Sequence, residues 1–512
     1  MSDANEIAAS LKPAHSAGCA PVSGRGRQVA RALGALGLAG MLASSCVVNY
    51  AKGRSEFSLV SQAQELEMGR MGDKEILAQF GAYGEGSLNA FVERVGTTVA
   101  AHSDAPTLQW HFRVLDSPVV NAFALPGGYI YVSRGLLAYL QNEAQLAMIL
   151  GHEIGHVTAR HTAGQITRQN VVGLGLQLGG LFFEGVRPYM GLLQTGMQLL
   201  FLTYSRGDET AADALGVTYA IRAGYAAGEG AAFFQTLKRL EAGKQGSTLP
   251  TFLSTHPDPG DREKTILKLA AAAQQQSPGA VGKGRDLAGF LPKLDGVVFG
   301  EDPRQGFVRN GLFIHPKLAF QFPVPTNWKV HNLPSKVEMV PPGQQVQAAM
   351  LMQGAPPTTP LAAAEAFATA NKATVLRSEP ATVHGLAAHR LVSRVAMANA
   401  QGGTMAVTVA SSFIRKGDQL FVLHGYAPSE SFANVSGTFE QVFAGFAPLT
   451  DRKLLDTQPK RLDIVTLNRP GLFQAVVPNP AAGGVTATEL SVLNQRQPAD
   501  PVSAGALLKV VK

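Results

Sequence analysis

The chain has 512 residues, of which 46% are apolar and 16% charged, a composition typical of globular proteins that excludes extended disorder. Its net charge is +7 at pH 7, but it contains no dense run of Lys and Arg, so we do not expect it to bind nucleic acid. A chain of this length is expected to form two or three domains.

Residues 1–45 have the pattern of an export signal. Three arginines precede an apolar run over residues 32–43, which is followed by two serines and Cys46. This run spans about 18 Å as a helix, too little for a hydrocarbon core of about 30 Å. Small residues directly before a cysteine resemble a bacterial lipoprotein signal, so we expect cleavage before Cys46 and a lipid on its sulfur. A buried N-terminal helix is the alternative.

The cysteine content agrees with export. Cys19 and Cys46 are the only cysteines, so cleavage leaves a single sulfur, which carries the lipid, and no disulfide. We therefore expect a lipoprotein of the bacterial cell envelope that faces the periplasm. Because Val47 rather than Asp follows Cys46, the outer membrane is preferred over the inner one.

Residues 58–272 have mostly helical periodicity. The expected elements are helices over 61–80 and 88–101, strands over 110–115 and 128–132, and a helix that begins after Asn142 with Gln145 in a capping position. A strongly apolar stretch over residues 171–203 is interrupted by charged residues and a proline, so neither half reaches the roughly 20 residues of a membrane span. We expect buried helices there, with a surface that touches the bilayer as the alternative.

After residue 272 the pattern changes. Residues 273–304 are expected to form a linker, residues 305–450 an α+β accessory domain with a β-hairpin, and residues 461–512 a small terminal unit. The fold class is therefore α+β, with a mainly helical first domain over residues 46–272 that contains a small sheet.

The motif of His152, Glu153 and His156 predicts a metal site. Histidines four apart lie on one face of a helix, so His152 and His156 can bind a single zinc ion. Glu153 can then act as general base toward a water whose pKa the zinc lowers toward 7. A chance match remains the alternative for so short a pattern.

A third ligand must come from elsewhere in the chain. His161 lies nine residues after His152, about 180° round an ideal helix, so it is expected to face away. Three acidic residues, Asp208, Glu209 and Asp213, begin another expected helix. Spacing does not choose among them, and an acidic first turn that suits the helix dipole is the alternative.

Four segments carry a family resemblance: residues 121–132, 142–161 and 205–213, and residues 254–257 together with Arg262. They resemble the HtpX/BepA-like family of zinc metallopeptidases, relatives of the CAAX prenyl endopeptidase within the gluzincin group. The resemblance covers about residues 60–265. It implies that Glu209 is the third zinc ligand and that Asp213 orients a ligand imidazole.

The same resemblance assigns a role to His256. It puts the loop before Pro257 over the metal cleft, where the imidazole stabilises a transition-state oxyanion or occupies the open zinc position. A loop histidine with a structural bond is the alternative. Beyond the linker, His315, His384, His389 and His424 have no ligand spacing and are interpreted as structural.

The terminal unit is similar to a degenerate LysM module. Leu472 stands where such modules usually carry Asp, so at most a weak contact with peptidoglycan is expected.

Together these features predict an endopeptidase with one Zn²⁺ per chain, anchored to the membrane through its lipid. The resemblance implies that it cuts unfolded or misassembled envelope polypeptides. The alternative is a non-catalytic chaperone or scaffold that assembles outer-membrane proteins and keeps the zinc. The presence of Glu153 favours catalysis, because a scaffold needs no general base.

A substrate-binding strand is expected over Gly128, Tyr129, Ile130 and Tyr131. A peptidase must hold its substrate extended, and an edge strand can do so by pairing with the substrate backbone. The β-branched and aromatic residues suit a strand. An ordinary interior strand is the alternative.

Overall fold

The structure is a computed structural model that describes residues 46–512 except 85, 169–203, 243–250, 258–260, 277–286, 334, 343–348, 356–357, 399–403 and 479–483. The expected export signal and the apolar stretch over residues 171–203 lie outside the described residues.

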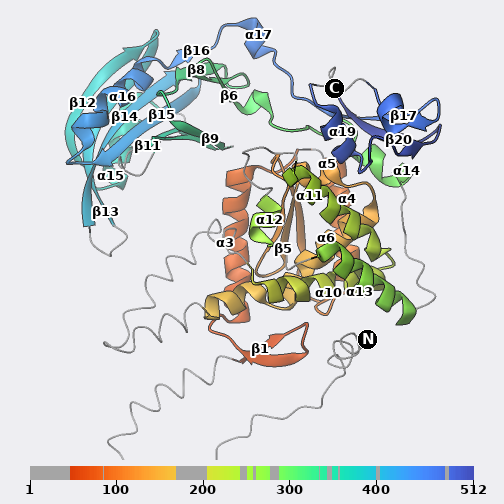
Figure 1. Ribbon diagram of the computed structural model, residues 1–512. Coiled ribbons are helices and arrows are strands. Elements are labelled where there is room, and N and C mark those ends of the chain that lie inside the picture. Colours follow the sequence, from red (N-terminus) through yellow and green to blue (C-terminus); the bar gives the residue numbers. More distant parts are fainter. Residues whose placement is uncertain are drawn as a thin grey trace, which may run out of the picture. The chain divides into compact units, whose positions relative to one another are not determined.

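The chain divides into two compact units (Figure 1). The first contains residues up to Leu77, Ala82–Phe299 and Arg461–Lys512, and the second mainly Gly300–Lys460. Both mix helices and strands, which confirms the α+β class.

The first described elements of this unit form a hairpin that was not predicted from the sequence. Strand β1 (Cys46–Asn49) pairs antiparallel with β2 (Arg54–Phe57), so that Cys46 lies opposite Phe57. Helices α3 (Gln62–Phe80) and α4 (Gly86–Ala100) follow, as predicted.

A three-stranded sheet lies beside these helices. It consists of β3 (His111–Leu115), β4 (Ala122–Leu125) and β5 (Tyr129–Ser133) in the order β3-β5-β4. Strand β5 runs parallel to β3 and antiparallel to β4, so it is the central strand.

The prediction that Gly128, Tyr129, Ile130 and Tyr131 form an edge strand for substrate is therefore wrong. Both backbone edges of β5 are paired, and Ile130 and Tyr131 are fully buried. A continuous run of β-branched and aromatic residues is typical of a strand covered on both faces. Gly128 has φ +93°, and a Cβ there would lie 2.3 Å from the Gln109 carbonyl oxygen, so its role is to form the turn before β5.

Helix α6 (Glu143–Thr158) is the centre of the first unit. It begins as predicted, because the Asn142 side chain accepts a hydrogen bond from the Gln145 backbone N–H. Leu146, Ile149 and Ile154 are buried in the core. The neighbouring helices, in chain order, are α5 (Arg134–Tyr139), α10 (Arg206–Arg222), the 3₁₀ turn η1 (Ala227–Gly230), α11 (Ala231–Ala242), α12 (Thr251–Thr255) and α13 (Arg262–Gln276).

Part of the expected linker is folded onto this unit. Helix α14 (Leu287–Phe290) and the 3₁₀ turn η2 (Leu291–Leu294) bury Phe290 and Leu294 in the same core as α6. The alanine-, glutamine- and glycine-rich start of the segment suggested a linker. The apolar residues after it instead pack into the core of the first unit.

The C-terminal residues also belong to the first unit. They form β17 (Leu462–Thr466), β18 (Gly471–Leu472), α18 (Phe473–Val476), α19 (Ala487–Leu493), β19 (Pro501–Val502) and β20 (Leu507–Val511). Strand β17 pairs antiparallel with β20. Leu462, Leu490 and Leu493 join the core that contains α6.

The described residues of the second unit form two antiparallel sheets. In its seven-stranded sheet the order is β12-β13-β14-β15-β11-β10-β9, and in its four-stranded sheet β16-β8-β7-β6. Their bounds are β6 (Phe307–Arg309), β7 (Leu312–His315), β8 (Phe320–Pro323), β9 (Lys329–Leu333), β10 (Lys336–Val340), β11 (Ala349–Ala355), β12 (Thr374–Val383), β13 (Leu386–Ala398), β14 (Thr404–Lys416), β15 (Gln419–Pro428) and β16 (Ala447–Pro448). Helices α15 (Pro360–Ala370) and α16 (Phe432–Ala444) pack on the larger sheet. The hairpin of β14 and β15 was predicted. The short elements η3 (Pro303–Gln305) and α17 (Arg452–Leu455) flank these sheets along the chain.

Among the described residues, no helix combines the length and the apolar character that a membrane span requires.

Candidate metal centre

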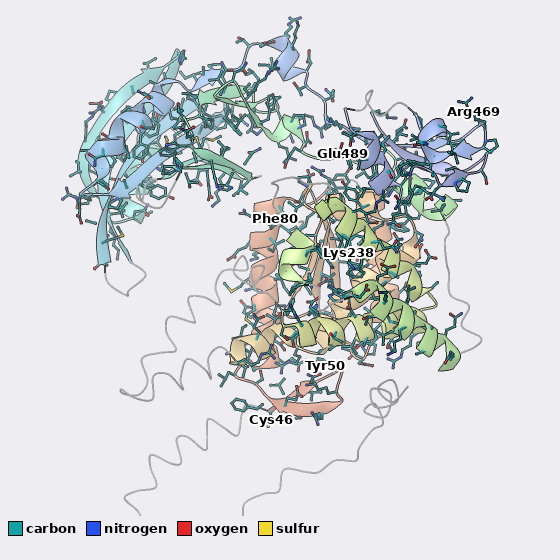
Figure 2. The ribbon with its side chains drawn as sticks, in the orientation of Figure 1. Cys46, Tyr50, Phe80, Lys238, Arg469 and Glu489 are labelled. Carbon is teal, nitrogen blue, oxygen red and sulfur yellow. The ribbon has the colours of Figure 1, made fainter. Side chains whose placement is uncertain are left out.

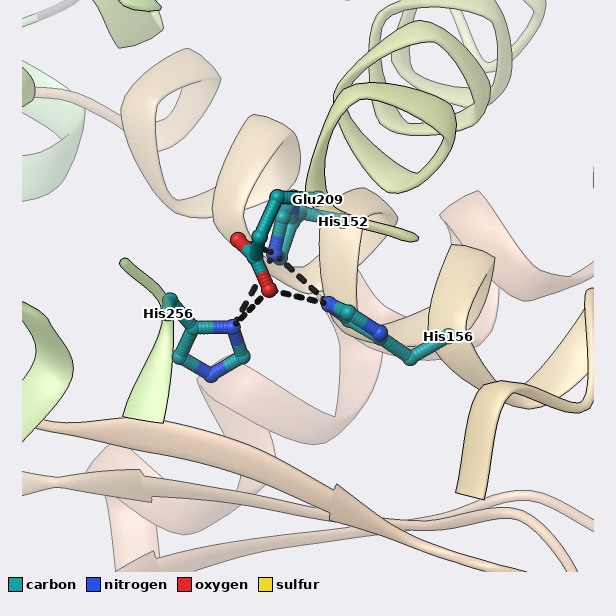
Figure 3. Close-up of side chains that lie close together, drawn as sticks. All are labelled: His152, His156, Glu209 and His256. Atoms are coloured by element: carbon teal, nitrogen blue, oxygen red, sulfur yellow. Dashed lines mark hydrogen bonds and ion pairs between the residues drawn. The ribbon is translucent and has the colours of Figure 1, made fainter. Parts of the chain in front are cut away.

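Four side chains from three parts of the first unit meet at one point (Figure 3). His152 and His156 come from α6, Glu209 from α10, and His256 from the residue after α12. Each contributes an imidazole nitrogen or a carboxylate oxygen, and these atoms all lie within 4.8 Å of one another. All four residues are buried. The predicted ligand set is thus brought together, with His256 added to it.

The distances within this cluster suit a cation. The Nε2 atoms of His152 and His156 lie 2.9 Å apart, and they lie 3.5 and 3.4 Å from the two oxygens of Glu209. His256 Nδ1 lies 3.1 Å from Glu209 Oε1. Imidazole nitrogens and a carboxylate oxygen are the donors that zinc prefers, so the residues present fit a zinc ion.

The charges of the cluster follow from its burial and its close contacts. Burial lowers the pKa of His156 well below its usual value. Burial opposes the charged form of His152 too, but hydrogen bonds to Asp213 and Glu209 outweigh it and raise the pKa of His152 to about 9. Although burial alone would raise the pKa of Glu209, the neighbouring His256, His152 and His156 lower it strongly. Glu209 is therefore an anion ready to bind a cation.

Asp213 and Arg262 both contact His152 at Nδ1, the ring nitrogen that does not face His156. Asp213 Oδ1 lies 2.9 Å from His152 Nδ1, which fixes the ring so that Nε2 faces the cluster, as the resemblance implied. Arg262 donates from Nε to Asp213 Oδ2 at 3.0 Å, and its Nη1 lies 3.1 Å from Glu209 Oε2. The guanidinium also stacks over the Phe234 ring at 4.3 Å.

Arg262 was not among the predicted site residues. It stands in the motif that carries the resemblance, yet an arginine is usually exposed, and nothing local in the sequence indicates that this one is buried. Tyr204 was missed as well. Its ring stacks on His156 with centroids 3.9 Å apart, and its hydroxyl lies 3.0 Å from Thr162 Oγ1.

His161 corrects another expectation. It was predicted to face away from the site, but its Nδ1 lies 2.9 Å from His156 Nδ1. The extrapolation assumed that the helix runs on, whereas α6 ends at Thr158 and Arg160 has φ +56°. This turn in the left-handed region redirects the chain and returns His161 to the site.

Of the three acidic candidates, only Glu209 points into the cluster. Asp208 accepts hydrogen bonds from the Ser205 backbone and hydroxyl, at 3.2 and 2.7 Å, in a capping box. Ser205 is the N-cap of α10, and Asp213 contacts Nδ1 of His152, whereas Glu209 lies near its Nε2.

Comparisons with known proteins agree with this geometry. Residues 87–270 match peptidase family M48. Mitochondrial metalloendopeptidase OMA1 of Arabidopsis thaliana is 37% identical over 169 residues, or 33% of each chain. Beta-barrel assembly-enhancing protease of Escherichia coli strain K12 is 26% identical over 244 residues, or 46% of this chain and 49% of that one. OMA1 of Schizosaccharomyces pombe is 32% identical over 228 residues, or 43% and 65%.

Residues 87–270 form an M48 peptidase domain. This confirms the resemblance to HtpX/BepA-like metallopeptidases. The aligned part of the chain spans between 33% and 65% of the length of these three relatives.

Glu153 of the M48 domain is buried without a hydrogen bond. Within the described part of the chain, neither of its carboxylate oxygens has a hydrogen-bond partner, and His256 Nε2 lies 3.6 Å from Oε1. Burial raises the pKa of Glu153. An unsatisfied buried carboxylate costs free energy, so its presence indicates a function that the fold alone does not require.

Strand β4 lies close to His156. A small cavity of about 10 Å³ is lined by residues from β4 and its turn together with the last turn of α6 and its neighbours: Glu65, Ala124, Leu125, Pro126, His156, Val157, Arg160 and Thr162. Strand β4, not β5, is an edge strand of this sheet, and its residues line this cavity together with His156.

Proposed function

We propose that the M48 domain is a zinc-dependent endopeptidase of the bacterial cell envelope that hydrolyses unfolded or misassembled polypeptides. The observation that carries this proposal is the buried cluster of His152, His156 and Glu209 beside the unbonded carboxylate of Glu153. The Escherichia coli relative is named for β-barrel assembly, which supports the envelope as the compartment and its polypeptides as the substrates.

His152, His156 and Glu209 would hold the zinc ion, which when bound polarises the scissile carbonyl and makes water a better nucleophile. Glu153 accepts the proton of the attacking water and passes it to the leaving amine. Burial raises its pKa, and this direction favours a base that must later return the proton as an acid. Asp213 and Arg262 keep the His152 ring in place.

The position of His256 supports the role of a fourth zinc ligand rather than that of an oxyanion stabiliser. Its Nδ1 lies 3.1 Å from Glu209 Oε1 and 3.3 Å from His152 Nε2, inside the cluster. Its Nε2 faces Glu153. If His256 binds the zinc ion, it would occupy the position at which the substrate carbonyl would bind. His256 would therefore have to move before catalysis.

The extended substrate would pair with β4. Because the Ser133 N–H bonds the Asn121 carbonyl, the alternation of an antiparallel pair turns the Ala122 and Ala124 backbone groups away from β5. These groups point to the side on which an added strand would pair. Recognition through the backbone reads little side-chain identity, which suits an enzyme for many unfolded chains.

A lipid on Cys46 would hold the M48 domain at the membrane. Cys46 is exposed at the start of β1, and Figure 2 shows it at an extremity of the unit. Val48 and Phe57, on the same face of the hairpin, are each 49% exposed. Mass spectrometry of the mature N-terminus is expected to detect an acylated cysteine. An N-terminus that begins at Met1 in the membrane fraction would refute the anchor.

Peptide hydrolysis and zinc content together test the proposed function. Wild type is expected to digest casein and to contain one zinc per chain. His156→Ala and Glu209→Ala are expected to lose both zinc and activity. Glu153→Gln is expected to keep zinc and lose activity, while Glu93→Gln, an exposed glutamate on α4, changes neither.

Two outcomes would contradict parts of this scheme. Glu209→Ala protein with full zinc and activity would return the ligand role to Asp208 or Asp213. Wild-type protein that binds zinc and suppresses the aggregation of unfolded chains without cutting them, equally well as Glu153→Gln, would favour the chaperone or scaffold.

A further inference from the structure

We propose that His161 is a positioning residue, which orients the metal ligand His156 by accepting a hydrogen bond from its Nδ1–H. This inference rests on the proposed zinc site. Its basis is the contact of 2.9 Å between the Nδ1 atoms of the two rings. Both residues are buried, and the rings meet edge to face with centroids 4.9 Å apart.

The direction of this hydrogen bond follows from the cluster. Two Nδ1 atoms in contact share one proton, since one nitrogen must donate and the other accept. His156 directs Nε2 toward His152 and Glu209, so this nitrogen offers its lone pair to a cation and the ring proton stays on Nδ1. His156 is therefore the donor and His161 Nδ1 the acceptor. The second ring nitrogen of His161 then carries its proton and faces Asp208 Oδ1 at 3.9 Å.

Hydrogen bonds to other segments hold Arg160 and Asp208, the two residues next to His161 in this arrangement. Arg160, whose φ of +56° makes the turn, donates from Nε to Glu65 Oε2 at 2.9 Å and from Nη2 to the Val60 carbonyl at 2.8 Å. These buried bonds stabilise a backbone conformation that a residue with a side chain rarely adopts. Asp208 is fixed by its capping box and by Arg168 Nη2 at 3.0 Å.

His161 thus does for His156 what Asp213 does for His152. Each ligand ring of α6 has a partner at Nδ1 that comes from outside the helix. Partners of this kind fix the tautomer and ring orientation of a metal ligand, and their loss weakens metal binding by about 10- to 100-fold. The acceptor at His156 is the neutral imidazole of His161, whereas the acceptor at His152 is the carboxylate of Asp213. The two ligand rings therefore have acceptors of different charge.

Zinc affinity, measured by competition with a chromogenic chelator, tests this role in the full chain. His161→Leu removes the acceptor but fills the space, and it is expected to weaken zinc binding by about 10- to 100-fold. His161→Asn keeps an acceptor oxygen near the place of Nδ1 and is expected to restore affinity to within a few-fold of wild type. His102→Leu, which changes an exposed histidine of the same unit, is the matched control.

A second readout separates positioning from packing. The visible absorption bands of the Co²⁺-substituted protein report the ligand field, so they should shift in His161→Leu and not in His161→Asn. Thermal unfolding of the metal-free proteins checks that each variant folds. If His161→Leu does not fold, His161→Ala provides the same comparison with His161→Asn.

The outcomes are distinct from those of the proposed function. If wild type binds no zinc, the proposed function fails. If wild type binds zinc and a folded acceptor-free variant binds it equally tightly with the same cobalt spectrum, only the role of His161 is overturned. It is also overturned if His161→Asn is impaired as much as His161→Leu, because the acceptor would then not be what matters.

Discussion

Gly151 and Gly216 bring α6 and α10 into backbone contact. A Cβ on Gly151 would lie 2.8 Å from the Gly216 carbonyl oxygen, and a Cβ on Gly216 would lie 2.7 Å from the His152 backbone nitrogen. Such distances leave no room for a side chain. The close approach of α10 to α6 therefore depends on two glycines that have no side chain in the site. The same approach brings Glu209 close to His152.

Gly216→Ala is expected to weaken zinc binding without changing a ligand. The added methyl group must push α10 away from α6 at a cost of about 1–3 kcal/mol, and about 1.4 kcal/mol corresponds to a tenfold change in affinity. Chelator competition measures the effect. Gly207→Ala on the same helix is the control, because its nearest neighbour is Ser205 Oγ at 3.8 Å. Equal affinities in the two variants would show that the helices have space to adjust.

A proline in β4 is expected to raise KM for unfolded polypeptides. Ala124→Pro removes an N–H that is directed away from β5, so the sheet keeps its pairing while an added strand loses a donor. Zinc content and thermal stability should remain close to those of wild type. Ile130→Pro in the central strand β5 is expected to unfold the unit instead. An unchanged KM in folded Ala124→Pro protein would move the substrate to another surface.

Lys509→Met is expected to destabilise the first unit. Lys509 is completely buried in β20, and its Nζ donates to the Ala138 and Leu140 carbonyl oxygens at 2.6 and 2.7 Å. Burial lowers its pKa well below the usual value. Leaving these carbonyls unsatisfied costs about 1–3 kcal/mol, which denaturant unfolding detects. Lys512→Met, on the exposed end of the chain, should have little effect. Equal stabilities would mean that the C-terminal residues do not brace the M48 domain.

The second unit is expected to lose stability in mild acid. Burial lowers the pKa of His424 and of His315 to about 4, compared with about 6.5 in the unfolded chain. The unfolded state therefore binds more protons between pH 6.5 and 4, and stability falls as pH decreases through this range, by about 3 kcal/mol for His424 alone. Hydrogen exchange in β14 and β15 at pH 7 and pH 4.5 measures it. In His424→Leu this dependence should be smaller, and an unaltered dependence would contradict the assignment.

Local patterns in the sequence determined the centre of the site. A spacing of four residues on a helix places His152 and His156 on one face whatever surrounds them. The Asn142 cap, the strand of β5 and the hairpin of β14 and β15 likewise follow from neighbouring residues. Such features depend on backbone geometry within a few residues, so periodicity and capping chemistry are sufficient to predict them.

Relations between distant segments required the tertiary structure. The choice of Glu209 over Asp208 depends on where α10 crosses α6, and the position of β5 depends on which strands pair with it. The recruitment of His161 depends on a left-handed residue, Arg160, held by bonds to residues about 100 positions earlier. A prediction from periodicity assumes that a helix or strand continues. It carries no information on where contacts with distant side chains end that helix or strand. Local spacing is therefore sufficient to predict the shared face of His152 and His156, whereas packing between distant elements decides which residues support them.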